Sequence, residues 1–347
     1  MTKWKQWGIW DGHLHLPDIQ KGQTLDLSAV FCVESRLCIS VEEDFATLWL
    51  NGPADESEAA LLSAVKLLGK TFSKFIIKGQ GNVGVFQKTS QSDLVTEVDL
   101  GIEMLLRIWI RRFYPDHKII GEEGFKDEIA VGDTVWYLDP VDGTNNYASN
   151  GKNVAIHIGC VRAGKPYVSF VGLPFYETYY YGSLNNPTVK DTTEGVFLMG
   201  NPVLPADPVI GTEYFSTNKR DLKIINALLG RFNNSRLCRT KSIGVNLVEF
   251  LEGRTNAFYK RNVKLWDIIA PMGIISLAFG DQIDAVMYVN TESTGTYRQY
   301  SPFSDDKDWV TWINNCHRDH CRIGFFILYP TSQPQLSKAI LEESELL

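Results

Sequence analysis

The sequence predicts a mixed α/β protein, because two kinds of apolar periodicity occur along one chain of 347 residues. Apolar residues recur at helical spacing over residues 57–76, and shorter apolar runs such as 135–138 have the length of strands. Hydrophobic residues make up 44% of the chain, which is enough for a large core in one domain or in two closely packed ones.

The first half of the chain alternates these two patterns. Residues 1–55 are predicted to form a strand-rich extension, and residues 57–76 a helix. A second amphipathic helix begins near Asp99 and carries its apolar side chains on one face. Further strands are expected at 119–120, 135–138, 154–161, 167–173 and 177–181.

The second half repeats the alternation after a proline-rich segment, 183–210, which is expected to link the two halves. Residues 291–320 are polar and irregular, which predicts a flap beside the site or a surface loop. Helices are expected at 219–230, at 245–252 and after Asp267, and strands near 210–216, 256–260, 284–289 and 323–329. We therefore divide the chain into an extension (1–55), a first half (56–200) and a second half (201–347).

The composition excludes several classes of protein. A formal net charge of -7 argues against a nucleic-acid binder, because affinity for the phosphate backbone depends on a surplus of Lys and Arg. No apolar run reaches the roughly 18 residues of a membrane span, and the first residues lack the apolar core of a signal peptide. The six cysteines show no disulfide-framework spacing, so reduced thiols in a cytoplasmic protein are predicted.

Residues 136–147 place two carboxylates beside a helix start. A strand is expected to end on Asp139, since Pro140 stops a helix there, and Asp142 is a good N-cap. The amides of Gly143 and Thr144 would lie in the first helical turn and favour an anion such as phosphate. Carboxylates without neighbouring sulfur or imidazole favour Mg²⁺ or Mn²⁺ over Zn²⁺. The segment therefore predicts a metal and phosphate site, and the alternative is a turn followed by a helix cap.

Three more segments carry acids at the ends of predicted helices or strands. Asp99 lies near a helix N-terminus, Glu122 follows the strand at 119–120, and Asp267 directly precedes an apolar helix. Taken in this order, the four segments resemble the inositol monophosphatase superfamily of Mg²⁺-dependent, lithium-sensitive phosphatases. The resemblance covers about residues 56–290.

This resemblance implies an α/β layered sandwich of alternating helix and sheet layers, with the active site between the two halves, and a homodimer. It implies two to three Mg²⁺ ions, with Mn²⁺ possible and Li⁺ as an inhibitor. Glu122, Asp139 and the carbonyl of Val141 would bind the first ion, with Thr144 close by. The second ion would be held by Asp139, Asp142 and Asp267, and a third, weaker ion is expected near Glu122.

The implied reaction is in-line attack of a metal-activated water on phosphorus, without a phosphoenzyme. Glu122, Thr144 and Asp99 would position or deprotonate the water, and Asp99 would hydrogen-bond the Thr144 hydroxyl. The amides of Gly143 and Thr144 would hold the phosphoryl oxygens. Lys88 lies on a loop that is mobile in the family. Thr144 could also be a first-turn residue that only bonds Asp99, which is compatible with the catalytic role.

The expected substrate is a small sugar or cyclitol phosphate, of the inositol monophosphate or fructose bisphosphate type. Lys260 takes the place of a glutamate of animal inositol monophosphatases, and the archaeal fructose bisphosphatase branch has a basic residue there, which suits an extra anionic group. The alternative is that Lys260 and Arg261 form a solvated surface pair. Ser242 belongs to the segment that usually contacts substrate, although Lys241 stands where glycine is common.

Two other functions remain open. A nucleotide 3'-phosphatase of the adenosine bisphosphate type is less favoured, because residues 145–147 are Asn-Asn-Tyr where those enzymes usually have Lys-Gly-Phe. The second is a catalytically silent member of the superfamily that acts as a regulatory or scaffold protein. Neither alternative involves a nucleic-acid polymer or a membrane.

Two histidine-containing segments resemble metal sites but are interpreted otherwise. His13 and His15 form a His-x-His pair like that of metal-dependent amidohydrolases, yet no further histidines match, so they are expected to be strand or turn residues. In Cys316–Cys321 the cysteines and histidines are too closely spaced for a usual zinc site, and a surface loop is expected.

Overall fold

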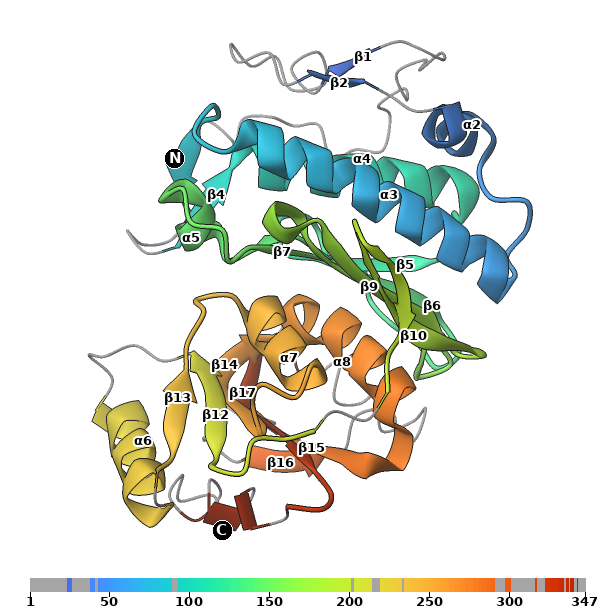
Figure 1. The fold of residues 1–347 in the computed structure, drawn as a ribbon. Coiled ribbons are helices and arrows are strands. Elements are labelled where there is room, and N and C mark those ends of the chain that lie inside the picture. The colour runs from blue at the N-terminus through green and yellow to red at the C-terminus, as the bar shows by residue number, and fades with distance from the viewer. Residues whose placement is uncertain are drawn as a thin grey trace.

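The computed structural model describes residues 24–26, 38–40, 43–88, 93–200, 203–213, 219–232, 234–290, 297–300, 316, 322–333, 335–336, 338–339 and 342. Within these residues, helices and two large sheets alternate in layers, as Figure 1 shows. One pair of helices covers the outer face of the first sheet, and a second pair lies between the two sheets. The layered α/β sandwich expected from the sequence is therefore confirmed.

The outer helix pair consists of α3 (Glu58–Gly79) and α4 (Glu97–Phe113). Ser57 caps α3 by accepting a hydrogen bond from the Ala60 amide at 3.3 Å. Thr96 and Asp99 form a capping box that begins α4. Both predicted helices are confirmed, and their apolar faces pack on the first sheet in one core.

The first sheet has seven strands in the order β11-β10-β9-β8-β7-β6-β5. The β5 strand pairs parallel with β6, and the pairs from β6 to β11 are antiparallel. Its strands are β5 (Lys118–Gly121), β6 (Thr134–Asp142), β7 (Ala155–Arg162), β8 (Lys165–Leu173), β9 (Thr178–Ser183), β10 (Asn186–Thr192) and β11 (Gly195–Leu198).

Two of these strands lie in the segment 183–210, which was expected to be only a link. That expectation is wrong for β10 and β11, because the prolines that suggested it do not interrupt the pairing. Pro187 stands where the register of β10 with β9 is irregular, between Asn186 and Val189. A proline at such an irregularity does not remove a regular ladder hydrogen bond.

The second sheet has six described strands in the order β13-β12-β14-β17-β15-β16. The β16 strand pairs antiparallel with β15, so residues 297–300 are not irregular as expected. The rest of the segment 291–320 lies outside the described residues, except for Cys316. The strands are β12 (Val209–Glu213), β13 (Arg236–Cys238), β14 (Ala257–Lys264), β15 (Ile283–Asn290), β16 (Tyr297–Tyr300) and β17 (Arg322–Pro330).

Helices α7 (Ile243–Leu251) and α8 (Leu265–Phe279) fill the space between the two sheets. Their side chains share one core with both sheets, which explains why α8 is apolar on nearly all sides. Helix α6 (Lys219–Arg231) lies beside the second sheet, where Asp221 bonds Arg261 of β14. These helices agree with the predictions at 219–230 and 245–252 and after Asp267.

The N-terminal extension contains both strand and helix. Strand β1 (Thr24–Asp26) pairs with β2 (Cys38–Ser40), within the alternating segment 37–41. Helix α2 (Glu43–Asn51) follows, and the expectation of a strand-rich extension did not include this helix. Phe45 and Trp49, which are one helical turn apart, are buried against α3. His13 and His15 lie outside the described residues.

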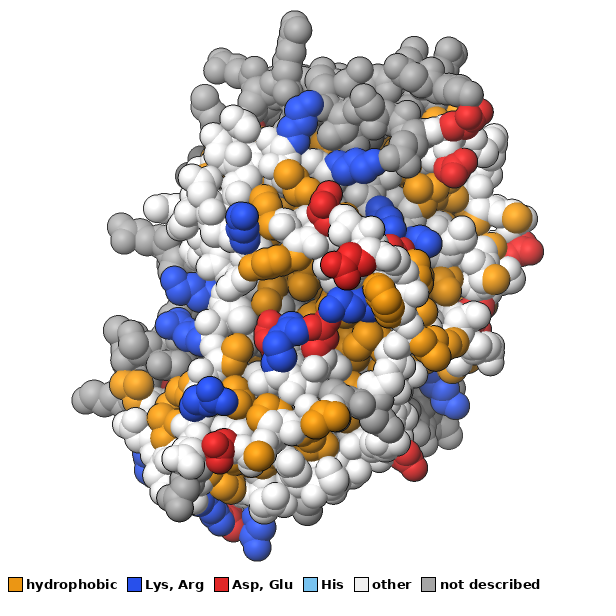
Figure 2. Space-filling model, in the orientation of Figure 1, with side chains coloured by type: hydrophobic (Ala, Val, Ile, Leu, Met, Phe, Trp, Pro, Cys, Tyr) orange, Lys and Arg blue, Asp and Glu red, His pale blue; other side chains and the backbone are white. Residues whose placement is uncertain are grey.

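Among the residues described, no helix combines the length and hydropathy needed to span a membrane. Acidic and basic side chains are interspersed on the face seen in Figure 2. Cys316 is buried and forms no disulfide, so a surface loop is wrong at this position. The other residues of the Cys316–Cys321 cluster lie outside the described part of the chain.

Candidate functional site

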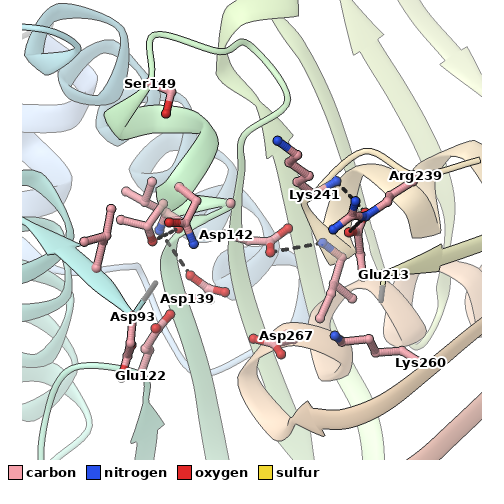
Figure 3. Close-up of a pocket in the computed structure, with 16 residues that line it drawn as sticks. Asp93, Glu122, Asp139, Asp142, Ser149, Glu213, Arg239, Lys241, Lys260 and Asp267 are labelled. Atoms are coloured by element: carbon pink, nitrogen blue, oxygen red, sulfur yellow. Dashed lines mark hydrogen bonds and ion pairs between the residues drawn. The ribbon is translucent and has the colours of Figure 1, made fainter. Parts of the chain in front are cut away.

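A cavity of about 500 Å³ lies between the two halves and brings together residues from distant parts of the chain. Figure 3 shows Glu122, which follows β5, and Asp139 of β6 on one side, and the basic side chains of the second half on the other. Most of the predicted site residues line this cavity: Glu122, Asp139, Val141, Asp142, Gly143, Thr144, Lys260 and Asp267. Lys88, Asp99 and Ser242 contact those lining residues from outside.

The end of β6 and the start of the following helix differ from the prediction. The strand continues past Asp139 to Asp142, with an irregular register against β7 between the two acids. Pro140 is tolerated there because β5 pairs only with residues 135–138. Gly143, not Asp142, is the N-cap of α5 (Thr144–Ala148), and its φ of 88° is in the left-handed region that favours glycine.

Asp142 caps another helix instead. Its Oδ1 accepts a hydrogen bond from the Ile243 amide at 3.1 Å, and its Oδ2 accepts from the Gly244 amide at 2.6 Å and the Ser242 hydroxyl at 2.5 Å. The carboxylate thus lies at the positive end of α7, which favours its charged form. Burial raises the pKa of Asp142, and the hydrogen bonds from Ser242 and Gly244 oppose that rise.

Asp139 is buried and Asp267 is half-buried, and each carboxylate accepts few hydrogen bonds. Asp139 Oδ1 accepts from the Val141 amide at 3.1 Å, and Asp267 Oδ2 accepts from the Lys264 amide at 3.0 Å. Burial raises the pKa of both carboxyls well above their ordinary values, and the neighbouring carboxylates, Glu122 and Asp142 among them, raise it further. Such a cluster favours bound cations.

Glu122 lies in the loop after β5. Lys88 and Glu103 of α4 both bond this loop. Lys88 Nζ lies 2.6 Å from Glu122 Oε1 and 2.5 Å from Glu123 Oε1. Burial alone would lower the pKa of Lys88, but the two carboxylates raise it above its ordinary value. From α4, the buried Glu103 carboxylate accepts from the amides of Glu123 at 2.8 Å and Gly124 at 2.7 Å.

The glycines that flank Glu122 and Glu123 serve close packing. These glycines are Gly121 and Gly124. Neither has a positive φ, and a Cβ on either would collide with the Glu103 carboxylate or the Arg107 guanidinium. Glu103 was not recognised as part of the site, because its position inside an amphipathic helix gives no such signal.

Asp99 and Thr144 form the expected hydrogen bond. The Thr144 hydroxyl lies 3.2 Å from Asp99 Oδ1 and 3.0 Å from the Val141 carbonyl oxygen. Burial raises the pKa of Asp99 to about 7, against the opposing effect of hydrogen bonds from Thr96. Asp99 therefore combines a position next to Thr144 with a pKa near neutrality, which suits proton transfer.

His157 was not expected at this site. It pairs with Asp139 across β6 and β7, and its Nδ1 lies 3.3 Å from the Trp266 carbonyl oxygen. Its Nε2 lies 3.7 Å from Asp142 Oδ2 and has no hydrogen-bond partner among the described residues. Burial lowers the pKa of His157 to about 4, so the ring is neutral at pH 7. The sequence did contain a signal for His157, because this residue lies on the strand expected at 154–161, directly after the segment 136–147 that carries Asp139 and Asp142.

The acids fit Mg²⁺ by donor chemistry, although they are not preassembled around one point. Within the part of the chain that is described, no three His, Cys, Asp or Glu side chains stand close enough to hold a metal ion. Asp142 is bonded to α7, and Glu122 is paired with Lys88. All the carboxylates are nevertheless hard oxygen donors in one cavity, which is the donor set that Mg²⁺ prefers.

The opposite wall carries Arg239, Lys241 and Lys260, together with Glu213. Lys260 lines the cavity, and Arg261 bonds Asp221 at 2.9 Å, so the two do not form the solvated pair that was considered. Arg239 and Glu213 were not singled out in the sequence, because neither belongs to a recognisable motif.

Residues 55–286 match the inositol monophosphatase family. The chain is 26% identical to a fructose-1,6-bisphosphatase/inositol-1-monophosphatase of Aquifex aeolicus, over 65% of this chain and 82% of that protein. It is 27% identical to 3'(2'),5'-bisphosphate nucleotidase 1 of Rattus norvegicus, over 59% of this chain and 76% of the relative. A solved IMPase/NADP phosphatase with Mg²⁺ and phosphate has the same fold, with a TM-score of 0.63, 18% identity and coverage of 81% and 95% of the two chains. The chain belongs to the inositol monophosphatase family.

Proposed function

We propose that this phosphatase is a Mg²⁺-dependent phosphomonoesterase that hydrolyses a small sugar or cyclitol phosphate, of the inositol monophosphate or fructose bisphosphate type. Membership of the family makes the chain a hydrolase of phosphate monoesters. The observation that carries the proposal is that Glu122, Asp139, Asp142 and Asp267, from separate segments, line one cavity of about 500 Å³. A cavity of this volume accepts a small ligand.

The proposed metal ligands follow from the arrangement of the acids. Glu122, Asp139 and the carbonyl of Val141 would hold one Mg²⁺, and Asp139, Asp142 and Asp267 a second. When bound, Mg²⁺ neutralises the phosphate and stabilises the charge that develops on the leaving oxygen. The high pKa of Asp139 and Asp267 supports this assignment, since uncompensated carboxylates raise one another's pKa.

The attacking water would be held by Glu122 and by the hydrogen-bonded pair of Asp99 and Thr144. The Thr144 hydroxyl would orient the water, and Asp99, whose pKa is raised to about 7, would take up its proton through Thr144. The amides of Gly143 and Thr144, at the start of α5, would bind the phosphoryl oxygens. His157 and Ser242 would keep Asp142 in place.

A nucleotide phosphatase is the second candidate, and the similarity to the rat bisphosphate nucleotidase favours it. A catalytically silent member of the family is less well supported, because the four carboxylates expected to hold metal, Glu122, Asp139, Asp142 and Asp267, all line the cavity. A homodimer and a cytoplasmic location remain predictions. Sedimentation of the purified chain would test the first, and fractionation of cells the second.

The test is phosphate release from inositol 1-phosphate, fructose 1,6-bisphosphate, other sugar phosphates and adenosine 3',5'-bisphosphate, with Mg²⁺ and after chelation. We expect metal-dependent release that Asp139→Asn abolishes and that Asp116→Asn, an exposed control, leaves unchanged. The fastest substrate decides between the sugar phosphate and the nucleotide. Mg²⁺ binding without turnover of any compound would instead favour a substrate outside this panel or a silent member of the family.

A further inference from the structure

We infer that Lys126 is a positioning residue, which fixes Glu122 relative to Asp267 by holding the Glu122 loop against Trp266. The Glu122 loop consists of residues 122–133, between β5 and β6. The inference rests on the proposed function, because it concerns two of the proposed metal ligands. It goes beyond that function by giving a role in metal binding to a side chain outside the cavity lining.

The ammonium group of Lys126 lies between the Glu122 loop and the first turn of α8. Its Nζ is 4.6 Å from the centroid of the Trp266 ring, which is within the range of a cation–π contact. The same Nζ donates to the Gly124 carbonyl oxygen at 3.3 Å and lies 3.5 Å from the Glu122 carbonyl oxygen. An ammonium group carries three donors, so one side chain joins the backbone of the loop to the helix.

The contact between Lys126 and Trp266 connects the two halves of the chain next to the acids of the site. Lys126 follows Glu122 in the same loop of the first half, and Trp266 directly precedes Asp267 in the second half. Both acids line the cavity. Because the contact is close to each acid along the chain, its loss would let the two acids move relative to one another.

The backbone on both sides of Lys126 is fixed within the first half. Before it in the chain, the buried Glu103 carboxylate accepts from two successive amides of the loop at 2.8 and 2.7 Å. After it, Asp127 Oδ2 accepts from the Ile119 amide at 2.7 Å and from the Arg111 guanidinium at 2.5 Å. The Lys126 side chain therefore extends toward α8 from a fixed point.

Trp266 is an equally fixed partner in the second half. The residue is only 5% exposed, and a second ammonium group, that of Lys264, lies 5.5 Å from the centroid of its ring. The Trp266 carbonyl oxygen lies 3.3 Å from Nδ1 of His157, which pairs with Asp139 across β6 and β7. Trp266 thus contacts the strand beside the acids of β6, and Lys126 connects the Glu122 loop to the same residue.

The position of Lys126 suits a role in metal binding. A cation–π contact is stronger when water is excluded, and the half-buried Lys126 lies over the buried ring of Trp266. Residues that orient metal ligands from outside typically change metal affinity or activity by about 10–100-fold when they are replaced. Lys126 orients a loop that carries one ligand against a helix that carries another.

The test is a calorimetric titration of the full chain with Mg²⁺. Lys126→Met keeps the length of the side chain and removes its charge, and we expect the Kd for Mg²⁺ to rise roughly tenfold. In phosphate release on the best substrate, the Mg²⁺ concentration that gives half the maximal rate should rise by a larger factor than kcat falls. Excess Mg²⁺ compensates for weak binding, because it restores the occupancy of the site.

Three further variants separate positioning from a general loss of stability. Lys126→Arg keeps a cation over the ring and should restore the wild-type Kd for Mg²⁺. Lys165→Met makes the same chemical change at an exposed lysine at the start of β8 and should leave the Kd unchanged. In a Trp266→Phe background the ring attracts a cation less strongly, so Lys126→Met should raise the Kd by a smaller factor than it does in the wild type.

The outcomes distinguish the inference from the proposed function. If Lys126→Met binds Mg²⁺ as tightly as the wild type, or if its effect is the same with Phe at position 266, the positioning role is overturned and the phosphatase is not. If the wild type binds no Mg²⁺, the proposed metal dependence fails, and amide hydrogen exchange of the metal-free chain decides the positioning role. Faster exchange at residues 122–127 and 265–268 in Lys126→Met, but not in Lys165→Met, supports the role, and unchanged exchange overturns it.

Discussion

Glu103 offers a direct test of how helix α4 positions the loop of Glu122. Its side chain is fully buried, and it accepts hydrogen bonds from the amides of Glu123 at 2.8 Å and Gly124 at 2.7 Å and from Arg107 Nε at 2.8 Å. The substitution Glu103→Gln keeps the shape of the side chain. It removes the charge, and it replaces one carboxylate oxygen with an amide NH₂ group. This NH₂ group cannot accept a hydrogen bond from the donor that the oxygen had bonded.

The structure sets the magnitude of the effect. A hydrogen bond to a charged group contributes about 1.5–3 kcal/mol, and the loss of one partner of a buried ion pair costs about 3–5 kcal/mol. Because Glu103 bonds two amides and Arg107, we expect Glu103→Gln to lower the free energy of unfolding by about 3–5 kcal/mol. Displacement of Glu122 by about 1 Å should also reduce kcat/KM roughly 10²-fold.

Denaturation with urea measures the first quantity, and phosphate release on the best substrate measures the second. Glu194→Gln is the matched control, since it makes the same chemical change at an exposed residue between β10 and β11. A stability loss below about 1 kcal/mol in Glu103→Gln, with activity retained, would refute the role assigned to Glu103.

Three other changes test the core of the site. Gly159→Val should lower the free energy of unfolding by about 1–3 kcal/mol in a urea titration, because a Cβ there comes within 3.2 Å of Ala270 on α8; unchanged stability would contradict this packing. The folded pKa of His157, about 4, lies below the unfolded value of 6.5, so the unfolded chain binds more protons between these values and stability falls as pH drops from about 6.5 to 4. The shift in the pKa of His157 corresponds to about 3 kcal/mol of unfolding free energy. Between pH 6.5 and 4 the wild type should therefore lose about 3 kcal/mol more stability than His157→Asn, and equal losses in the two proteins would contradict this. Mg²⁺ at 100 times its Kd should raise the free energy of unfolding by about 2.7 kcal/mol, and calorimetry should show a smaller rise in Asp139→Asn.

The long helices and the central strands of the first sheet could be predicted because their own residues carry the signal. Apolar spacing located α3 and α4, and continuous apolar runs located β6 to β9. Short strands such as β13, of three residues, and β16, of four, carry too little pattern. Their extended conformation depends on pairing with a neighbouring strand, which local sequence does not encode.

The sequence by itself determined which chemistry this protein has available. The two acids of β6, the acid after β5 and the acid at the start of α8 are oxygen donors whatever their neighbours, and their order along the chain was enough for the resemblance to the family. Their interactions were decided by tertiary structure. Asp142 bonds amides that lie 101 and 102 residues further along the chain, and so caps α7 and not the helix that follows it. His157 lies close to the two acids of β6, and Lys241 lines the same cavity as the carboxylates. Electrostatic and hydrogen-bond energies depend on distance through space, which is fixed only when the two sheets pack on the helices between them.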